Sequence, residues 1–362
     1  SLSGLEPFDS SRHRVLNGVM KSVSRQTSRM SGWRWLPVIL LACACSPRSP
    51  DHEVIVHEFP DGRTGIATGV FEQPAVAYPV IPVGDRFEHV LTFQTTPMMP
   101  PLREAAVTHG PLVLFSDDFE TIVFSPMEHF FSSVVWFEDG AIGSGINGET
   151  AELPAGFRHR FLLVRGRGIA ATIERWGKLL LHDRGRERLD RYADRGLSYL
   201  GYWTDNGAAY YYHTAEGMNE EETLLAVRDD AVARGIPYGY FQLDSWWYFK
   251  EESGGIGPPG GLIRWEPQEE MFPDGLAAFQ QRLGLPLVAH SRWFARDNAY
   301  RDQYDFVVDE RMALPLERGV FDRFMQDAKD WGVFTYEQDW LMNQYWGVGY
   351  LRQAPGRAEA WM

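Results

Sequence analysis

Cysteine is nearly absent from this chain of 362 residues. The two cysteines, Cys43 and Cys45, lie together at the end of one apolar run near the N-terminus. The rest of the sequence therefore has no disulfide framework, no thiol nucleophile and no cysteine ligand for a metal ion. The motifs G-x-S-x-G and H-E-x-x-H are missing too, so neither a serine hydrolase elbow nor a zinc protease helix is indicated. We expect no metal and no cofactor.

Positive charge is scarce outside the N-terminal segment. Residues 1–50 carry seven Lys and Arg against two Asp and Glu, whereas the remainder carries 28 against 47. Nucleic acids and anionic membranes attract cationic surfaces, so an acidic body argues against both as partners. With 44% hydrophobic and 14% aromatic residues, the chain can still bury a large core, and its length suggests about two domains.

Long hydrophobic runs are missing as well. The run W-R-W-L-P-V-I-L-L-A-C-A-C is too short to span a membrane, and basic residues precede it. This pattern is typical of a secretory signal. Leu40-Leu41-Ala42-Cys43 also resembles a bacterial lipobox, which implies that Cys43 is lipidated after cleavage. A plain signal peptide cut near Ala44 is the alternative.

We therefore expect residues 1–45 to be a signal or lipoprotein segment. The mature protein would be secreted or periplasmic, with a lipid anchor as its only contact with the membrane. The chain begins with Ser, and both Met20 and Met30 are natural starts, which leaves open whether residues 1–29 are translated.

Short strand patterns separated by turn residues fill the sequence from His52 to about Gly168. Val, Ile, Phe and Trp are frequent in them: E-V-I-V-H-E-F, H-V-L-T-F-Q-T, P-L-V-L-F-S, E-T-I-V-F-S and S-S-V-V-W-F-E. We expect residues 50–170 to form a β-sandwich. The motif Gly143-Ser-Gly145-Ile-Asn-Gly148 matches G-x-G-x-x-G, but no helical pattern follows it, and we interpret it as a chance match in a turn.

A charged segment follows, and its pattern from about residue 173 to 193 is helical. We expect residues 171–195 to be a helical linker whose charged residues form a solvated face.

After residue 195 the pattern changes to alternating strands and helices. The predicted helices end at Gly235, Gly284 and Gly332, which are 49 and 48 residues apart. The first begins at Asn219, with Glu222 completing a capping box. A strand directly follows each glycine: I-P-Y-G-Y-F-Q-L-D, L-P-L-V-A-H-S-R-W and V-F-T-Y-E-Q-D-W. The first strand of the series is L-S-Y-L-G-Y-W-T-D-N-G.

A closed β/α barrel needs eight such strands in about 250 residues. Residues 196–362 hold four. We therefore predict the first half of a (β/α)8 TIM barrel, a catalytic domain that is incomplete in this chain.

Polar and aromatic residues gather at the predicted strand ends, where such barrels build their active sites. Eight of the thirteen tryptophans lie between residues 203 and 346. Indole faces suit the C–H faces of sugars, and carboxylates and Arg suit their hydroxyls. For any single Trp, packing in the core is the alternative. The candidate sugar-binding residues are Trp203, Asp205, Asp244, Trp246, Trp247, His290, Arg292, Trp293, Glu337, Asp339 and Trp340.

This order of segments resembles the α-galactosidases and raffinose-synthase-like enzymes of glycoside hydrolase clan D, nearest family 36. The resemblance covers about residues 105–345. The sandwich segments G-P-L-V-L-F-S and G-I-N-G-E-T-A-E-L-P-A-G-F look like that family's N-terminal domain. F-Q-L-D-S-W-W is similar to its I-D-D-G-W strand, and F-T-Y-E-Q-D-W to its Y-L-K-W-D strand. The resemblance implies that Asp244 binds sugar and that Asp339 is the nucleophile.

Three positions depart from the family pattern. Ser245 stands where a second Asp is expected, Trp246 where Gly is expected, and Glu337 where a sugar-binding Lys is expected. Specificity for galactose is therefore an open question. The family's acid/base residue comes from a later strand that this chain does not contain.

The sequence thus predicts a retaining glycoside hydrolase or transglycosidase that acts on α-linked sugars. An oligosaccharide or glycoside is the expected substrate. The alternative is a carbohydrate-binding protein on a barrel scaffold that has lost catalysis. Glu337 is the rival candidate for the nucleophile, because it lies on the same face of the same predicted strand as Asp339.

If Cys43 is acylated, palmitate labelling of the expressed protein should disappear in Cys43→Ala. Unchanged labelling would leave only the plain signal peptide.

Overall fold

The computed structural model describes residues 51–93, 110–252 and 259–362. The expected signal segment 1–45, with Cys43, lies outside these residues. Among the helices of the described ranges, none has the length and apolar character that crossing a membrane requires.

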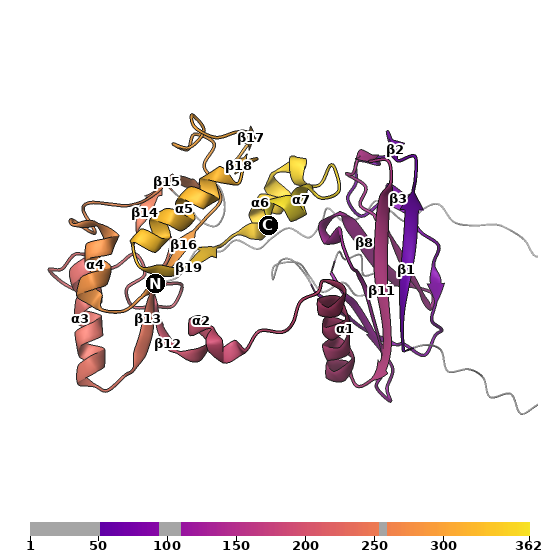
Figure 1. Ribbon diagram of the computed structural model, residues 1–362, viewed down its shortest axis with the longest axis horizontal. Helices are drawn as coiled ribbons and strands as arrows, with labels where there is room; N and C mark the ends of the chain where they lie inside the picture. Colours follow the sequence, from indigo (N-terminus) through magenta and orange to yellow (C-terminus); the bar gives the residue numbers. More distant parts are fainter. Residues whose placement is uncertain (1–50, 94–109, 253–258) are drawn as a thin grey trace, which may run out of the picture. The chain divides into compact units, whose positions relative to one another are not determined.

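The first part of the chain is built from antiparallel strands (Figure 1). Five of them form one sheet in the order β1-β11-β7-β6-β5. These are β1 (His52–Phe59), β5 (His89–Thr92), β6 (Leu112–Phe115), β7 (Glu120–Pro126) and β11 (Phe157–Arg167). The strands that the sequence predicted here are therefore confirmed as strands.

A second sheet packs against the first. It consists of β3 (Val76–Ala77), β4 (Ile81–Pro82), β8 (Ser133–Glu138) and β9 (Ala141–Ile146), with β9 paired to the other three. One hydrophobic core joins the two sheets: Phe124 and Phe161 from the first lie in the same cluster as Ile142 and Ile146 from the second. A short pair, β2 (Arg63–Thr64) and β10 (Glu152–Leu153), and a 3-10 turn, η1 (Phe130–Ser132), complete this part.

The glycine motif begins in a strand and ends in a turn, so the turn predicted for it is wrong for Gly143 and Gly145 and right for Gly148. Gly143 and Gly145 belong to β9. A Cβ on Gly145 would lie 2.3 Å from the carbonyl oxygen of Val76, on the paired strand β3. The glycine is needed because another backbone approaches this closely, which is a usual reason for glycine inside a strand.

The predicted linker helix is shorter than expected and is only partly solvated. Helix α1 (Ile169–Asp183) packs Ile173, Trp176 and Leu180 against the first sheet, around Val123 and Val164. Two turns, η2 (Arg191–Ala193) and α2 (Arg195–Ser198), follow it. The sequence suggested a solvated face because its charges are numerous, but the apolar residues between them form a buried stripe.

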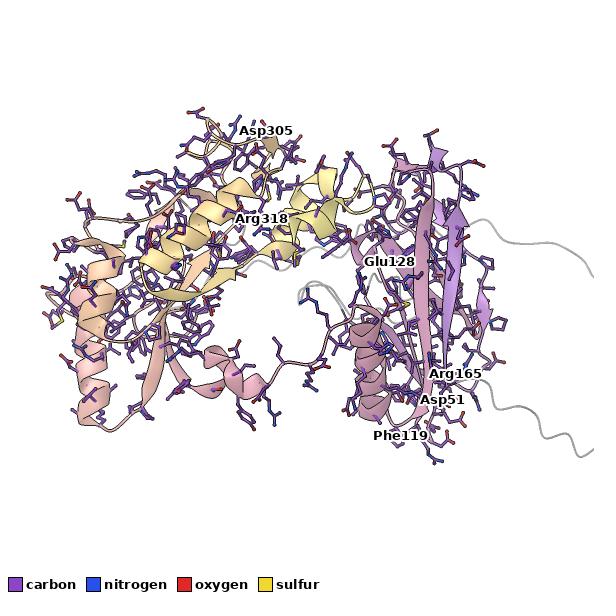
Figure 2. The ribbon with its side chains drawn as sticks, in the orientation of Figure 1. Asp51, Phe119, Glu128, Arg165, Asp305 and Arg318 are labelled. Carbon is purple, nitrogen blue, oxygen red and sulfur yellow. The ribbon has the colours of Figure 1, made fainter. Side chains whose placement is uncertain are left out.

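An ion-pair network fixes the C-terminal end of α1. Arg160 of β11 contacts Glu128 and Asp183, each at 2.7 Å (Glu128 is labelled in Figure 2). All three side chains are only about a fifth exposed. Such a network is worth more than a single surface pair because its members are partly desolvated and share one bidentate guanidinium.

The second part of the chain contains four parallel strands in the order β12-β13-β16-β19. These are β12 (Leu200–Trp203), β13 (Tyr238–Leu243), β16 (Leu287–Ser291) and β19 (Val333–Gln338). Helices α3 (Glu220–Ala233), α4 (Gly275–Leu283) and α5 (Gly319–Asp330) connect them (Figure 1). The sheet of the described residues is open, with β12 and β19 at its edges.

Local sequence signals set the ends of these helices. Asn219 and Glu222 form the capping box that starts α3. The glycines at 235, 284 and 332 all have a φ near +72°, the left-handed conformation that ends a helix and favours glycine. The predicted helix stops are confirmed.

The helices bury one face each against the parallel sheet. Leu224, Leu276, Phe279 and Phe324 lie in one core with Phe241 and Leu243 of β13. Met325 of α5 lies outside this core and is 42% exposed.

Short elements that the sequence did not predict are inserted between the strands. Two hairpins follow β13 and β16, and short helices follow β19. They are β14 (Tyr248–Lys250) with β15 (Leu262–Pro267), β17 (Phe306–Val308) with β18 (Ala313–Pro315), α6 (Leu341–Gly347), η3 (Gly349–Leu351) and α7 (Arg357–Trp361).

Gly145→Ala should lower the free energy of unfolding by about 1–3 kcal/mol, because the added methyl group meets backbone rather than a movable side chain. Gly177→Ala is the matched control. Gly177 lies inside α1 with nothing within 4 Å of a built Cβ, so this change should stabilise by about 0.4–1 kcal/mol. Urea denaturation measures both. A neutral Gly145→Ala would contradict the close pairing of β3 and β9.

Candidate active site

The C-terminal ends of the parallel strands bring together most of the predicted polar residues. Asp244 follows β13, His290 lies near the end of β16, and Glu337 and Asp339 lie at the end of β19. His290 is the register partner of Glu337 on the neighbouring strand. Because neighbouring parallel strands end at the same edge, these side chains share one side of the sheet.

A side-chain amide joins two of the carboxylates. Gln242 Nε2 donates to Asp244 Oδ2 at 3.2 Å and to Glu337 Oε2 at 2.9 Å. Gln242 Oε1 accepts the backbone N–H of Thr204 at 3.1 Å, which fixes which end of the amide faces the carboxylates. Gln242 is fully buried, so its orientation is set by these contacts alone.

The hydroxyl of Thr204 is a second buried junction. Thr204 Oγ1 donates to the carbonyl of Gln242 at 2.8 Å. It accepts the backbone N–H of Asp244 at 3.1 Å and the indole N–H of Trp246 at 3.0 Å. Asp244 Oδ1 accepts the backbone N–H of Ser245 at 2.6 Å. These contacts hold Asp244 and Trp246 in one orientation.

Asp339 is held as a carboxylate at the exposed end of this cluster. Its Oδ2 lies 3.2 Å from His290 Nε2, and its Oδ1 accepts the backbone N–H of Trp340 at 2.6 Å. Partial burial opposes ionisation, but the hydrogen bonds from His290 and Trp340 and the charge of Arg292 outweigh it and lower the pKa of Asp339. The side chain is 51% exposed, so a ligand can reach it.

Tyr248 orients the imidazole. Its hydroxyl lies 3.1 Å from His290 Nδ1, and burial holds the pKa of Tyr248 well above its usual value. A carboxylate only accepts, so His290 presents an N–H from Nε2 to an ionised Asp339. With the proton of a neutral ring on Nε2, Nδ1 is the acceptor for the Tyr248 hydroxyl.

Glu337 has the opposite environment, although it is two residues from Asp339 on the same strand. Burial raises the pKa of Glu337, and the hydrogen bond from Gln242 offsets this only in part. The charges of Asp244 and Asp339 act in the same direction as burial. The pKa of Glu337 is therefore raised while the pKa of Asp339 is lowered. Opposite shifts of two neighbouring carboxyl groups are typical of sites that use one carboxylate and one neutral acid.

Trp340 begins α6 in a left-handed conformation, with φ 58° and ψ 30°. This conformation is uncommon for a bulky side chain and costs about 1–3 kcal/mol. It turns the backbone N–H of Trp340 toward the Asp339 carboxylate. The guanidinium carbon of Arg292 lies 5.3 Å from the centroid of the Trp340 ring.

Two of the predicted tryptophans are core residues. Trp247 is fully buried and packs against Tyr248, Trp265 and Trp331. Trp293 is fully buried and packs edge-on against Trp340 at 5.4 Å. The sugar-binding role predicted for these two indoles is incompatible with their burial.

The remaining predicted residues lie nearer to the surface or to the cleft. Trp203 is 43% exposed, and its indole N–H lies 3.3 Å from the hydroxyl of Tyr240. Asp205 is half-buried and accepts the backbone N–H of Asn206 at 2.5 Å. Trp246 stacks on Phe272 and lines a cleft together with Arg292.

The cleft has a volume of about 720 Å³. Most of its wall comes from residues that the sequence did not single out, in the loop after β12 and in the β14–β15 hairpin. They include Tyr211, Tyr212, Tyr248, Lys250, Glu251 and Gln268. Only the run Tyr210-Tyr211-Tyr212 could have drawn attention to this wall, as an aromatic cluster next to a strand end.

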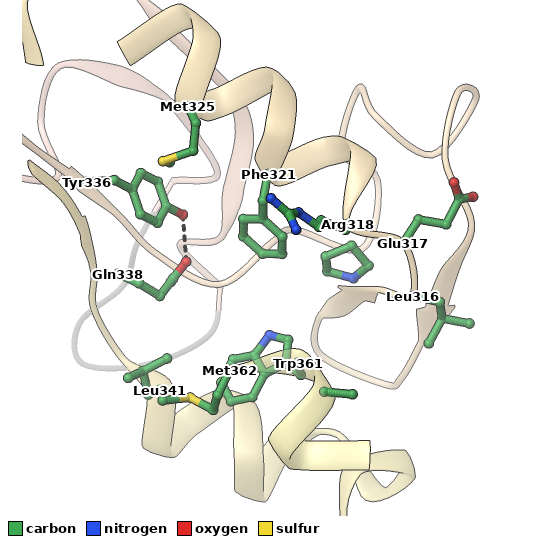
Figure 3. Close-up of a pocket in the computed structure, with 12 residues that line it drawn as sticks. Leu316, Glu317, Arg318, Phe321, Met325, Tyr336, Gln338, Leu341, Trp361 and Met362 are labelled. Carbon is green, nitrogen blue, oxygen red and sulfur yellow. Dashed lines mark hydrogen bonds between the residues drawn. The ribbon is translucent and has the colours of Figure 1, made fainter. Parts of the chain in front are cut away.

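A second cavity, of about 470 Å³, lies beside the edge strand β19 (Figure 3). Phe321 and Met325 of α5, Leu341 of α6 and Trp361 of α7 line it. Tyr336 donates to Gln338 across its wall at 2.6 Å. None of the candidate site residues contributes to this cavity.

Within the described ranges, no group of three or more His, Cys, Asp or Glu side chains is arranged to hold a metal ion.

No protein-family model matches the sequence, and no curated protein is similar to it. Among solved structures, the chain is similar to an α-galactosidase from Thermus thermophilus, with 18% identity and a TM-score of 0.44 over 80% of this chain and 57% of that one. It is also similar to an α-N-acetylgalactosaminidase from Bifidobacterium bifidum, with 11% identity and a TM-score of 0.39 over 63% of this chain and 44% of that one. A xylosidase from Aspergillus niger has 9% identity and a TM-score of 0.36 over 78% and 35%. The chain thus spans little more than half of the α-galactosidase.

Replacing the two carboxyl groups of β19 should change stability in opposite directions. Glu337 has a raised pKa in the folded state, so it contributes stability that is fully present below about pH 4.5 and lost as pH rises. Asp339 has a lowered pKa, so its contribution is present above about pH 3.8 and lost as pH falls below that value.

At pH 7, Glu337→Gln should therefore raise the melting temperature and Asp339→Asn should lower it. Both differences from the parent protein should shrink as the pH approaches 3.5. Thermal melts at pH 7, 5 and 3.5 measure them. Shifts of the same sign at pH 7 would show that the two environments are not opposed.

Proposed function

We propose that this protein is a retaining glycoside hydrolase or transglycosidase that acts on α-linked sugars, with Asp339 as its nucleophile. The observation that carries the proposal is the environment of Asp339. Its carboxylate lies at the end of a parallel strand, keeps a lowered pKa through His290, and remains half exposed beside Asp244 and Glu337. We further propose that the fold is a β-sandwich followed by the first half of a (β/α)8 barrel.

In the first step, a carboxylate oxygen of Asp339 would attack the anomeric carbon and form a glycosyl ester. The glycosidic C–O bond breaks, its electron pair stays on the leaving oxygen, and an acid protonates that oxygen. In the second step, water, or a sugar hydroxyl in a transglycosidase, attacks the same carbon and releases Asp339 as a carboxylate. A lowered pKa suits both steps, because the attacking and the departing group is the ionised form.

The neighbouring polar residues would hold the sugar. Asp244 keeps acceptor capacity after its two hydrogen bonds, so it can accept a sugar O–H. Glu337, whose pKa is raised, is suited to donate an O–H to a sugar oxygen. Gln242 holds both groups in place, and Trp246 offers an aromatic surface in the cleft.

These side chains are the basis of the proposed function. The α-galactosidase and the α-N-acetylgalactosaminidase named above belong by name to the same reaction class, and the choice of an α-linked sugar follows the family resemblance of the sequence. Export and lipid attachment through Cys43 are a separate part of the proposal, with the labelling experiment above as its test.

The nucleophile can be tested with an activated substrate, 2,4-dinitrophenyl α-D-galactoside, whose leaving group needs no acid. Asp339→Gly should lower turnover on the order of 10³-fold or more, as loss of a nucleophile does in other hydrolases. Added azide should restore turnover by filling the vacated space and should give a glycosyl azide of inverted configuration. Release of dinitrophenol and NMR of the azide product measure both effects.

Glu337→Gly is the matched control, because it removes a carboxylate two residues away on the same strand. It should lose turnover without rescue by azide. If Asp339→Gly stays active and azide rescues Glu337→Gly instead, the nucleophile is Glu337. If the parent protein binds the glycoside but releases no dinitrophenol, the protein is a carbohydrate-binding protein on a catalytic scaffold.

A further inference from the structure

A buried cation in the cleft has no carboxylate within ion-pair distance among the described residues. The side chain of Arg292 is 6% exposed, and its Nη1 donates to the carbonyl of Gly260 at 3.3 Å. Its Nε is buried without a hydrogen-bond acceptor among the described residues. In the same ranges, no carboxylate lies within 4 Å of the guanidinium. A buried charge in this state is costly, which points to a ligand that completes it.

The rings beside Arg292 hold it in place without neutralising it. The guanidinium carbon lies 4.8 Å from the centroid of Trp293 and 5.3 Å from that of Trp340. The two indoles are nearly perpendicular to each other, and their contacts with the guanidinium restrict where it can lie. Arg292 lines the cleft, and its charge helps to lower the pKa of Asp339, the proposed nucleophile, which is not itself part of the cleft lining.

A second cation, Lys250, lines the same cleft from strand β14. Its ammonium lies 4.1 Å from the centroid of the Tyr212 ring and donates to the Tyr212 hydroxyl. Burial, reinforced by the charge of Arg292, lowers the pKa of Lys250 to about 8. Near neutral pH most of the ammonium is therefore still charged, and no carboxylate of the described residues pairs with it.

Three of the nearby carboxylates already accept hydrogen bonds from other groups. Glu251 accepts the backbone N–H groups of Gly260 and Gly261. Asp244 accepts from Gln242 and Ser245, and Asp339 accepts from His290 and Trp340. Glu252 lines the cleft as well. The structure contains no ion pair between any of these carboxylates and either cation within the described ranges.

We propose that the cleft binds a glycoside carrying an anionic group, a uronic-acid carboxylate or a sulfate ester, through Arg292 and Lys250. This inference rests on the proposed glycosidase function and specifies its substrate class. Arg292 would supply a guanidinium from the end of β16, and Lys250 an ammonium from the β14–β15 hairpin. Trp246 and Tyr212, which line the same cleft, would contact the apolar face of the sugar.

Binding is tested on the whole chain carrying Asp339→Asn, which prevents turnover of the ligand. The probes are methyl α-D-galacturonide, methyl α-D-galactoside 6-sulfate and the neutral methyl α-D-galactoside, each titrated by calorimetry. At least one anionic probe should bind ten-fold or more tightly than the neutral one. The preference for the uronide or for the sulfate identifies the anionic group. Equal or tighter binding of the neutral probe, or binding of none, would overturn the inference.

Variants then locate the anion. Arg292→Gln and, independently, Lys250→Met should each reduce the anionic preference at least five-fold while the affinity for the neutral probe changes less than two-fold. Lys250 is at the rim of the cleft, so its variant keeps the test open if Arg292→Gln does not fold. Arg264→Gln is the control. Arg264 lies in the same hairpin, over the Phe249 ring, but outside the cleft lining, and its loss should leave both affinities unchanged.

Turnover separates this inference from the function on which it rests. Hydrolysis of the neutral dinitrophenyl galactoside with no binding of anionic probes would leave a glycosidase and remove the anionic substrate. Tight binding of the uronide or the sulfate with no hydrolysis of any dinitrophenyl glycoside would leave the anion site and remove the catalytic function.

Discussion

A single buried amide, that of Gln242, joins the strand ends that carry two of the candidate carboxyl groups. Its nitrogen holds Asp244 and Glu337, and its oxygen is held in turn by the backbone of Thr204. Three of the four parallel strands, β12, β13 and β19, thus meet at one side chain. Without it, two carboxyl groups would face each other across the sheet without a donor between them, which is unfavourable in a buried setting.

This arrangement also accounts for the opposite pKa shifts of Glu337 and Asp339. Glu337 points to the buried network, where burial favours its neutral form, whereas Asp339 lies beyond the strand end and receives donors from His290 and Trp340. A difference of two residues along one strand therefore separates a neutral acid from a carboxylate. Residues two positions apart on a strand point to the same face but lie at different distances from the strand end, and so they differ in burial.

Much of the architecture could be predicted from the sequence, because its signals are local. The helix ends at Gly235, Gly284 and Gly332 are marked by a glycine in the left-handed conformation and by the end of the helical spacing of apolar residues. The capping box at Asn219 depends on only two side chains. The strand ends carrying Asp244, His290, Glu337 and Asp339 followed from the same pattern. The orientation of each tryptophan could not be predicted, because Trp246 and Trp247 lie in the turn between β13 and β14, where no regular alternation applies; both are buried, and only Trp246 also lines the cleft.

The cleft wall was beyond prediction for a different reason. Tyr212 and Lys250 come from a loop and from the β14–β15 hairpin, whose positions depend on contacts distant in sequence. The sequence also could not show that Arg292 has no carboxylate within ion-pair distance among the described residues. It does not reveal which carboxylates already accept hydrogen bonds from other groups.

The left-handed backbone at Trp340 has a consequence for how this site could vary. Glycine is the residue that the backbone at this position prefers, and it would relieve the local strain. It would also remove the ring against which the Arg292 guanidinium rests. The indole also packs against Trp293, so glycine would relieve the backbone strain and lose this packing at the same time. At residue 340 an unfavourable backbone conformation is therefore balanced by side-chain contacts, including the contact with Arg292.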